Sequence, residues 1–88
     1  MLNRGELLEL LESEYQEIKG TQRMLREEDD IRGLGVDSLQ VVELIHSVEE
    51  RVGIQLIGDS RIQHVRTVGD VVELALEVQS ESGAGVGG

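Results

Sequence analysis

Apolar residues recur at three- and four-residue steps in three stretches of the chain, the spacing that gathers side chains on one face of an α-helix. The first stretch begins after Asn3, a residue type that caps helices, and ends at Gly20, a common helix stop. We therefore expect a first helix between these two residues. Its predicted apolar face consists of Leu8, Leu11, Tyr15 and Ile18.

The second stretch follows Asp37, which can cap a helix that runs to about Arg51. Gly53 is placed to end it. One line of apolar residues along this helix has the spacing of a buried stripe, so the helix is expected to pack with that side inward. The predicted stripe consists of Val41, Ile45, Val48 and Val52, with Leu44 beside it.

The third stretch begins where Thr67 and Asp70 have the spacing of a capping box, with Asp in the place more often taken by Glu. Apolar residues continue at helical spacing to Val78, which predicts the last helix. Residues 80–88 are Ser, Gly and Ala with little else, too few anchors to pack. The sequence therefore predicts a folded domain over 1–79 and a flexible tail over 80–88.

Two connections separate these stretches. From Thr21 to Val36 the periodicity fails, which predicts a long loop held by scattered apolar anchors. The expected anchors are Met24, Leu25, Ile31 and Leu34. Gly58 and the Asp that follows it suggest a turn into a short helix near Ser60 to Val65. No strand-pairing signal and no internal repeat is present. The expected fold is all-α, an antiparallel bundle of three main helices plus one short helix.

The composition of the chain limits the classes of function that it can have. The 88 residues carry a net charge of -10 and no Cys. An acidic surface repels phosphate backbones and anionic membranes, so we expect no nucleic-acid or membrane partner and partners with basic surfaces instead. So small a core leaves no room for a deep, water-free active site, which favours a carrier or binding module over an enzyme. Acidic residues among the first leucines exclude a signal peptide. Cytoplasmic is the default location for a chain without Cys, and we expect a monomer.

Ser38 is the candidate residue for a covalent modification. It follows Gly35 and Asp37 in the run Leu-Gly-Val-Asp-Ser-Leu, where the glycine permits a sharp turn and the aspartate caps the helix. The serine hydroxyl would then stand exposed in the first helical turn. An anion attached there would meet unpaired backbone N–H groups and the positive end of the helix dipole, a contribution of about 0.3–1 kcal/mol. The simpler interpretation is that Asp37 and Ser38 are capping residues only.

The segment from Leu34 to Leu39, with Val42-Glu43-Leu44 after it, resembles the attachment signature of acyl carrier proteins. The resemblance extends from about Ile31 to Val78. It implies that a phosphopantetheinyl transferase moves 4'-phosphopantetheine from coenzyme A to Ser38, with Asp37 supporting the site. The arm would hold acyl or polyketide intermediates as thioesters for a ketosynthase, acyltransferase or thioesterase. Short acyl chains would fold into a pocket between the second and third helices, lined here by Leu44, Val48, Ile57 and Ile62.

A candidate docking surface lies along a second line of residues on the helix predicted to follow Asp37. Leu39, Val42 and His46 follow one another at three- and four-residue steps, flanked by Glu43 and Glu49. An apolar strip bordered by carboxylates suits brief docking to basic partners. The alternative is that the two apolar residues complete the core and the glutamates form a solvated face. No second His or Cys joins His46 in a metal or catalytic set, so no metal is expected.

Rival interpretations stay open at this point. An aminoacyl or peptidyl carrier of nonribosomal synthesis is the nearest one, although such carriers often have His before the serine. An acidic helical interaction module without a prosthetic group is the other. Gly33, Gln40, His46 and Gly58 depart from the housekeeping acyl carrier pattern, which favours polyketide over fatty acid biosynthesis.

Overall fold

The computed structural model describes residues 2–87, and the side chains of residues 2–81. Its elements are three α-helices and two short 3₁₀ helices, and no strand occurs in the described range. In chain order they are α1 (Arg4–Lys19), η1 (Ile31–Leu34), α2 (Ser38–Val52), η2 (Ser60–His64) and α3 (Val68–Gly87). The all-α prediction is confirmed, and η2 is the short helix expected after Asp59. The element η1 was not expected from the sequence.

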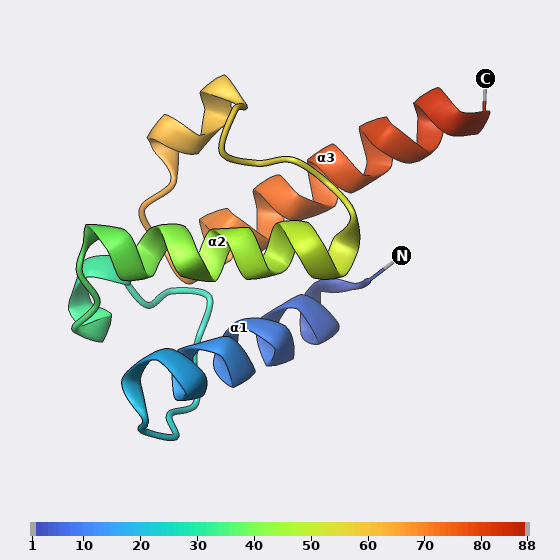
Figure 1. Cartoon of the computed structure of the whole chain (residues 1–88). Helices are drawn as coiled ribbons and strands as arrows, with labels where there is room; N and C mark the ends of the chain where they lie inside the picture. Colours follow the sequence, from blue (N-terminus) through green and yellow to red (C-terminus); the bar gives the residue numbers. More distant parts are fainter. Residues whose placement is uncertain (1, 88) are drawn as a thin grey trace.

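Helix α1 runs in the direction opposite to both α2 and α3, which share one direction (Figure 1). The shared direction is possible because residues 53–67 cross back along the bundle and carry η2 on the way. All three helices contact one another. Antiparallel packing therefore applies to α1 against the other two helices.

The helix boundaries follow the predicted caps. The Asn3 side chain accepts a 2.9 Å hydrogen bond from the backbone N–H of Glu6, whose carboxylate accepts one of 3.0 Å in return from the N–H of Asn3. Thr67 and Asp70 form the same reciprocal pair at the start of α3, at 3.0 and 3.1 Å. Gly53 ends α2 with φ of 77°, a left-handed conformation that favours glycine.

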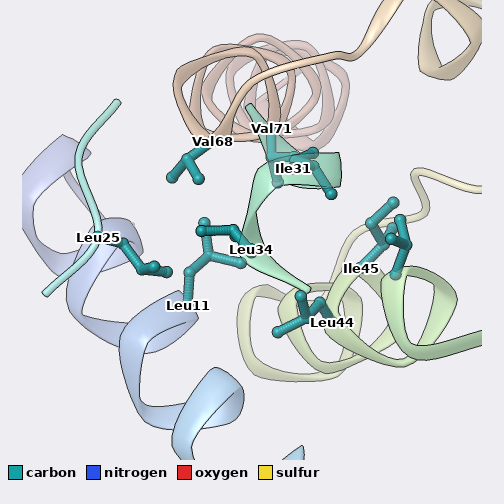
Figure 2. A pocket seen from close by; sticks show the side chains of 9 residues that line it. Leu11, Leu25, Ile31, Leu34, Leu44, Ile45, Val68 and Val71 are labelled. Atoms are coloured by element: carbon teal, nitrogen blue, oxygen red, sulfur yellow. The ribbon is translucent and has the colours of Figure 1, made fainter. Parts of the chain in front are cut away.

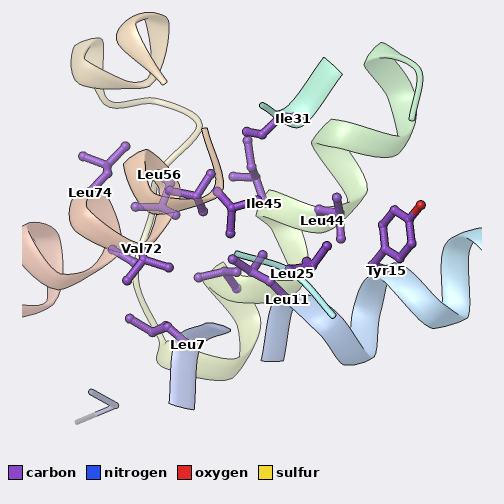
Figure 3. Packing of buried hydrophobic residues seen from close by; sticks show 14 of the residues in the cluster. Leu7, Leu11, Tyr15, Leu25, Ile31, Leu44, Ile45, Leu56, Val72 and Leu74 are labelled. Atoms are coloured by element: carbon purple, nitrogen blue, oxygen red, sulfur yellow. The ribbon is translucent and has the colours of Figure 1, made fainter. Parts of the chain in front are cut away.

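The core lies where the three helices meet (Figure 3). On α1 the buried face is Leu7, Leu11 and Tyr15, whereas Leu8 and Ile18 are half-buried at its margin. The expected face was therefore correct at Leu11 and Tyr15, but Leu7 is buried in place of Leu8. Packing against two helices decides which of several neighbouring leucines points inward. On α2 the predicted stripe is correct at its centre. Its buried members are Leu44, Ile45 and Val48.

The long loop is anchored by three of the four apolar residues expected to hold it. Leu25, Ile31 and Leu34 are buried, while Met24 is exposed. The loop is also tied to the start of α3, because the N–H of Val68 donates to the carbonyl of Asp29 at 2.9 Å and the N–H of Gly69 donates to that of Glu27 at 2.8 Å. These bonds hold η1, and the turn after it, against the bundle.

The C-terminal segment of α3 includes part of the predicted tail. The helix as described runs to Gly87, and residue 88 lies outside the described range. Gln79 is buried, and its side-chain amide exchanges hydrogen bonds of 2.9 and 3.0 Å with the backbone of Leu2. The boundary at residue 79 and the flexibility of the tail stay predictions. Within the described range, no helix has the length and apolar character needed to cross a bilayer.

Candidate functional site

Ser38 is the first residue of α2, and its side chain is exposed. The chain reaches it through Gly35, whose φ of 75° lies in the left-handed region and ends η1. Asp37 follows in an extended conformation and caps the helix. The turn that the sequence predicted therefore presents the serine at the surface.

A capping box fixes this turn from the helix side. The Asp37 carboxylate accepts a 2.8 Å hydrogen bond from the N–H of Gln40, and the Gln40 amide oxygen accepts one of 3.1 Å from the N–H of Asp37. Gln40 is one of the departures from the acyl carrier pattern. Its amide oxygen can accept this bond as a carboxylate would, so the departure leaves the turn intact.

The start of α2 fits an attached phosphodiester. Within the described residues, the N–H groups of Ser38 and Leu39 have no hydrogen-bond acceptor, because the first bond of the helix runs from Val41 to the carbonyl of Asp37. The first turn also contains no acidic residue. Free N–H donors and the positive end of the helix dipole favour a negative charge at this position.

Two side chains of α1 hold the other side of the turn. The Tyr15 hydroxyl donates a 2.8 Å hydrogen bond to the carbonyl of Leu34, and this contact is buried. The Lys19 ammonium donates one of 2.7 Å to the carbonyl of Gly35. Sequence reasoning assigned Tyr15 to the apolar face only. The one available signal was that a buried tyrosine hydroxyl usually requires a partner.

The second line of α2 is exposed. Leu39 keeps 68% and Val42 keeps 47% of its surface accessible, so neither side chain completes the core. Glu43 and His46 are also exposed. The chain thus has an apolar strip that starts beside Ser38 and continues along the first turns of the helix.

Glu49 is turned inward from this strip. Its carboxylate accepts hydrogen bonds from the N–H groups of Leu56 and Ile57, at 2.6 and 2.9 Å, and lies 3.2 Å from Nδ1 of His46. Partial burial raises the pKa of Glu49, but the Ile57, Leu56 and His46 contacts outweigh it, so the pKa is lowered. His46 also contacts Glu50, at 3.1 Å. In the described part of the chain, no group of three potential ligands could hold a metal ion.

Two of the hollows beside α2 contain residues expected to line the acyl pocket. A cavity of about 20 Å³ in the core has room for about one water molecule (Figure 2). It is lined by apolar side chains of α1, the long loop, α2 and α3. A wider groove of about 480 Å³ lies between η1, α2 and η2. The groove is lined by Asp30, Ile31, Arg32, Val41, Ile45, Ile62, Gln63, Val65 and Arg66.

The pocket expected from the resemblance is split in this structure. Leu44 lines the small cavity, whereas Ile62 lines the groove. Val48 is fully buried and Ile57 keeps 46% of its surface exposed, so these two do not form a shared wall with the others. Side-chain periodicity could not show this, because the connection after α2 has no regular repeat that assigns its residues to a side.

The sequence of the chain is similar to that of known proteins. The family model described as "Phosphopantetheine attachment site" matches residues 6–75. A protein of Saccharopolyspora erythraea named "Acyl carrier protein" is 37% identical over 79 residues, which covers 88% of this chain and 82% of that protein. A protein of the same name from Helicobacter acinonychis is 47% identical over 47 residues, 53% of this chain and 59% of that protein.

No solved structure matches the chain significantly. The family match extends from α1 into α3 and so includes every element that builds the turn around Ser38. Proteins of this family bear 4'-phosphopantetheine covalently, and they are carriers and not catalysts. The chain belongs to the acyl carrier protein family.

Proposed function

We propose that Ser38 is the residue that receives the phosphopantetheine arm. The observation that carries this proposal is the exposed serine at a capped helix start, beside two backbone N–H groups that have no acceptor within the described residues. Ser47 is a poorer candidate, because its hydroxyl donates to the carbonyl of Glu43 at 3.0 Å and contacts Glu14 at 3.1 Å.

Ser60 offers an informative comparison. It is exposed and follows a capping residue, Asp59, as Ser38 follows Asp37. The carboxylate of Asp59 is bound by the Arg61 guanidinium at 2.7 and 2.9 Å, and η2 has only five residues. A helix this short has little dipole to favour an anion. We therefore assign the arm to the serine at the start of α2.

The residues around Ser38 have separate tasks in this proposal. The Asp37 carboxylate keeps the turn closed through its reciprocal hydrogen bonds with Gln40. The N–H groups of Ser38 and Leu39 stabilise the negative charge beside them. The arm, when attached, supplies the thiol on which acyl groups are carried as thioesters; the chain itself has no Cys.

The exposed strip of α2 is the proposed docking surface for partner enzymes. Leu39 and Val42 offer a small apolar area, and Glu43 with His46 borders it. Carboxylates on this face speed encounter with basic surfaces, while the small apolar area keeps release fast. We propose that this surface binds the phosphopantetheinyl transferase and the ketosynthase, acyltransferase or thioesterase of the pathway. Glu49 contributes mainly by fixing the neighbouring connection.

We further propose that the cargo is a polyketide intermediate, with fatty acid synthesis as the alternative, and that the protein acts as a cytoplasmic monomer. The groove between α2 and η2 supports a partly polar cargo, since Arg32, Gln63 and Arg66 line it together with apolar side chains. The net charge of -10 supports the monomer, because like-charged copies repel.

The test is the intact mass of the chain after incubation with coenzyme A, magnesium and a promiscuous phosphopantetheinyl transferase. The wild-type chain and Ser60→Ala should each gain the mass of one arm, and Ser38→Ala should gain none. Circular dichroism of Ser38→Ala should match the wild type, because an exposed first-turn hydroxyl contributes little to stability. A modified Ser38→Ala chain would refute the assignment.

A further inference from the structure

Tyr15 and Lys19 are one helical turn apart on α1, on the side that faces the attachment turn. Their donors bind the carbonyls of two consecutive residues, Leu34 at 2.8 Å and Gly35 at 2.7 Å. One contact is neutral and buried, and the other is charged and exposed. Two donors on successive carbonyls restrain the orientation of both peptide planes.

These contacts act on the part of the turn that is easiest to reorient. Gly35 is in the left-handed conformation, and a glycine has access to many other backbone angles. The carbonyl of Leu34 is buried with its residue, so without the Tyr15 hydroxyl it would lack a partner and would favour a rearranged loop. Lys19 adds a charge-assisted bond to the next carbonyl.

The attachment turn is thus held from both sides. Tyr15 and Lys19 fix it before Val36, and the capping box of Asp37 and Gln40 fixes it after. The half-buried Val36 is the one residue between the two restraints. A change at either side would let Ser38 leave the position in which its hydroxyl stands free at the helix start.

We propose that Tyr15 and Lys19 are positioning residues for attachment of the arm, acting through the carbonyls of Leu34 and Gly35. This inference rests on the proposed function of Ser38. The two side chains raise the fraction of molecules in which the turn has the conformation that a transferase binds. A variant in which fewer molecules have this conformation binds the transferase with a proportionally higher apparent dissociation constant. Its chemical step is unchanged.

Lys19 allows a clean test because it is exposed and its removal leaves no buried group unpaired. Lys19→Gln replaces the charged ammonium donor by a shorter, neutral amide, whereas Lys19→Arg keeps the positive charge and long N–H donors. Arg23→Gln is the matched control, since Arg23 is a nearby exposed cation with no hydrogen bond or ion pair among the described residues. The assay is arm transfer to the unmodified 88-residue chain by a purified promiscuous transferase, with coenzyme A saturating.

We expect Lys19→Gln to raise the KM for the carrier roughly 3- to 10-fold while kcat stays within about twofold of the wild type. Lys19→Arg and Arg23→Gln should stay close to the wild type in both constants. The backbone amides of Asp37 and Gln40 should exchange hydrogen faster in Lys19→Gln, because their capping bonds break when the turn reorients. Circular dichroism should be unchanged.

Tyr15→Phe tests the buried contact. Its effect on KM should exceed that of Val72→Ala, a fully buried core position remote from the turn, at a similar loss of thermal stability. If both variants raise KM equally, Tyr15 acts only through global stability and its positioning role is refuted.

Two results separate this inference from the proposed function. A wild-type chain that accepts no arm refutes both. A wild-type chain that is modified normally, with KM and amide exchange of Lys19→Gln unchanged, refutes the positioning role alone. An equal rise in KM for Arg23→Gln would also refute the positioning role alone, because it would show a general effect of positive charge on this surface.

Discussion

The carboxylate of Glu49, on α2, accepts a 2.6 Å hydrogen bond from the backbone N–H of Leu56 in the connection that follows the helix. The same oxygen accepts a 2.9 Å bond from the N–H of Ile57. Leu56 is fully buried, while Ile57 remains exposed beside it. One acidic side chain thus fixes the connection from which the chain continues to η2.

Glu49→Gln should lower the free energy of unfolding by about 1–2 kcal/mol, because an amide oxygen bears no charge and accepts the two N–H groups less strongly. Urea denaturation would measure the change. Glu50→Gln is the matched control: that side chain is exposed and forms an ion pair with the exposed His46, so its effect should stay below about 0.5 kcal/mol. Equal losses in the two variants would show that the bonds to Leu56 and Ile57 are not important for stability.

Gly69→Ala should destabilise the fold. A Cβ at this position would lie 2.9 Å from the carbonyl oxygen of Glu27, which also accepts the Gly69 N–H at 2.8 Å. The loop or the start of α3 must shift, at a cost of about 1–3 kcal/mol in the free energy of unfolding. At Gly58 a Cβ would meet no atom within 4 Å, so Gly58→Ala should be neutral or slightly stabilising. Denaturant unfolding that ranks the two variants the other way would contradict this packing.

Stability should fall in acid. Hydrogen bonds from Arg61 lower the pKa of Asp59 from 3.8 to about 2. The pKa of Asp70 is also lowered, by the N–H groups of Arg66 and Thr67. Because these carboxylates bind protons more readily in the unfolded chain, acid favours unfolding. For Asp59 the stabilisation is complete above about pH 4 and is lost as the pH falls towards 2.

The acid effect can be assigned by comparing wild type with Asp59→Asn. The wild-type free energy of unfolding should decrease from about pH 4 to about pH 2, and the variant should show a shallower decrease over that range. Identical slopes would mean that the ion pair with Arg61 does not persist in solution.

Much of this fold could be predicted because its helix boundaries depend on neighbouring residues. Asn3, Asp37 and Thr67 cap helices through side-chain bonds to residues three positions on, and such signals are visible in sequence. Gly53 ends α2 for the same local reason. The candidate attachment turn could therefore be predicted from local sequence patterns, and the family match supports its context.

The missed features depend on contacts between distant segments. Leu7, and not the expected Leu8, is buried in the core, because the positions of the two other helices determine which side of α1 is covered. Glu49 was expected to flank the docking strip, yet it binds N–H groups seven and eight residues further on. The Tyr15 contact spans 19 positions. No spacing rule connects residues this far apart, so sequence patterns could not place them.

The proposed docking strip can be tested by placing a charged residue at each of its two apolar positions. Leu39→Asp and Val42→Asp should each raise the transferase KM for the carrier about 5- to 10-fold, because each removes apolar area from the contact and adds a charge that must be desolvated. Met24→Asp is the control, since Met24 is 80% exposed in the long loop, outside the strip. A rise in KM for Met24→Asp equal to the others would show that the strip has no special role.

The central claim is that one hydroxyl, that of Ser38, receives the arm. The most direct measurement is fragment mass spectrometry of the wild-type chain after reaction with coenzyme A and a promiscuous transferase. The predicted result is a single arm located on Ser38, with Ser60 and every other serine unmodified. An arm on a different residue, or a folded chain that never acquires one, would contradict the account.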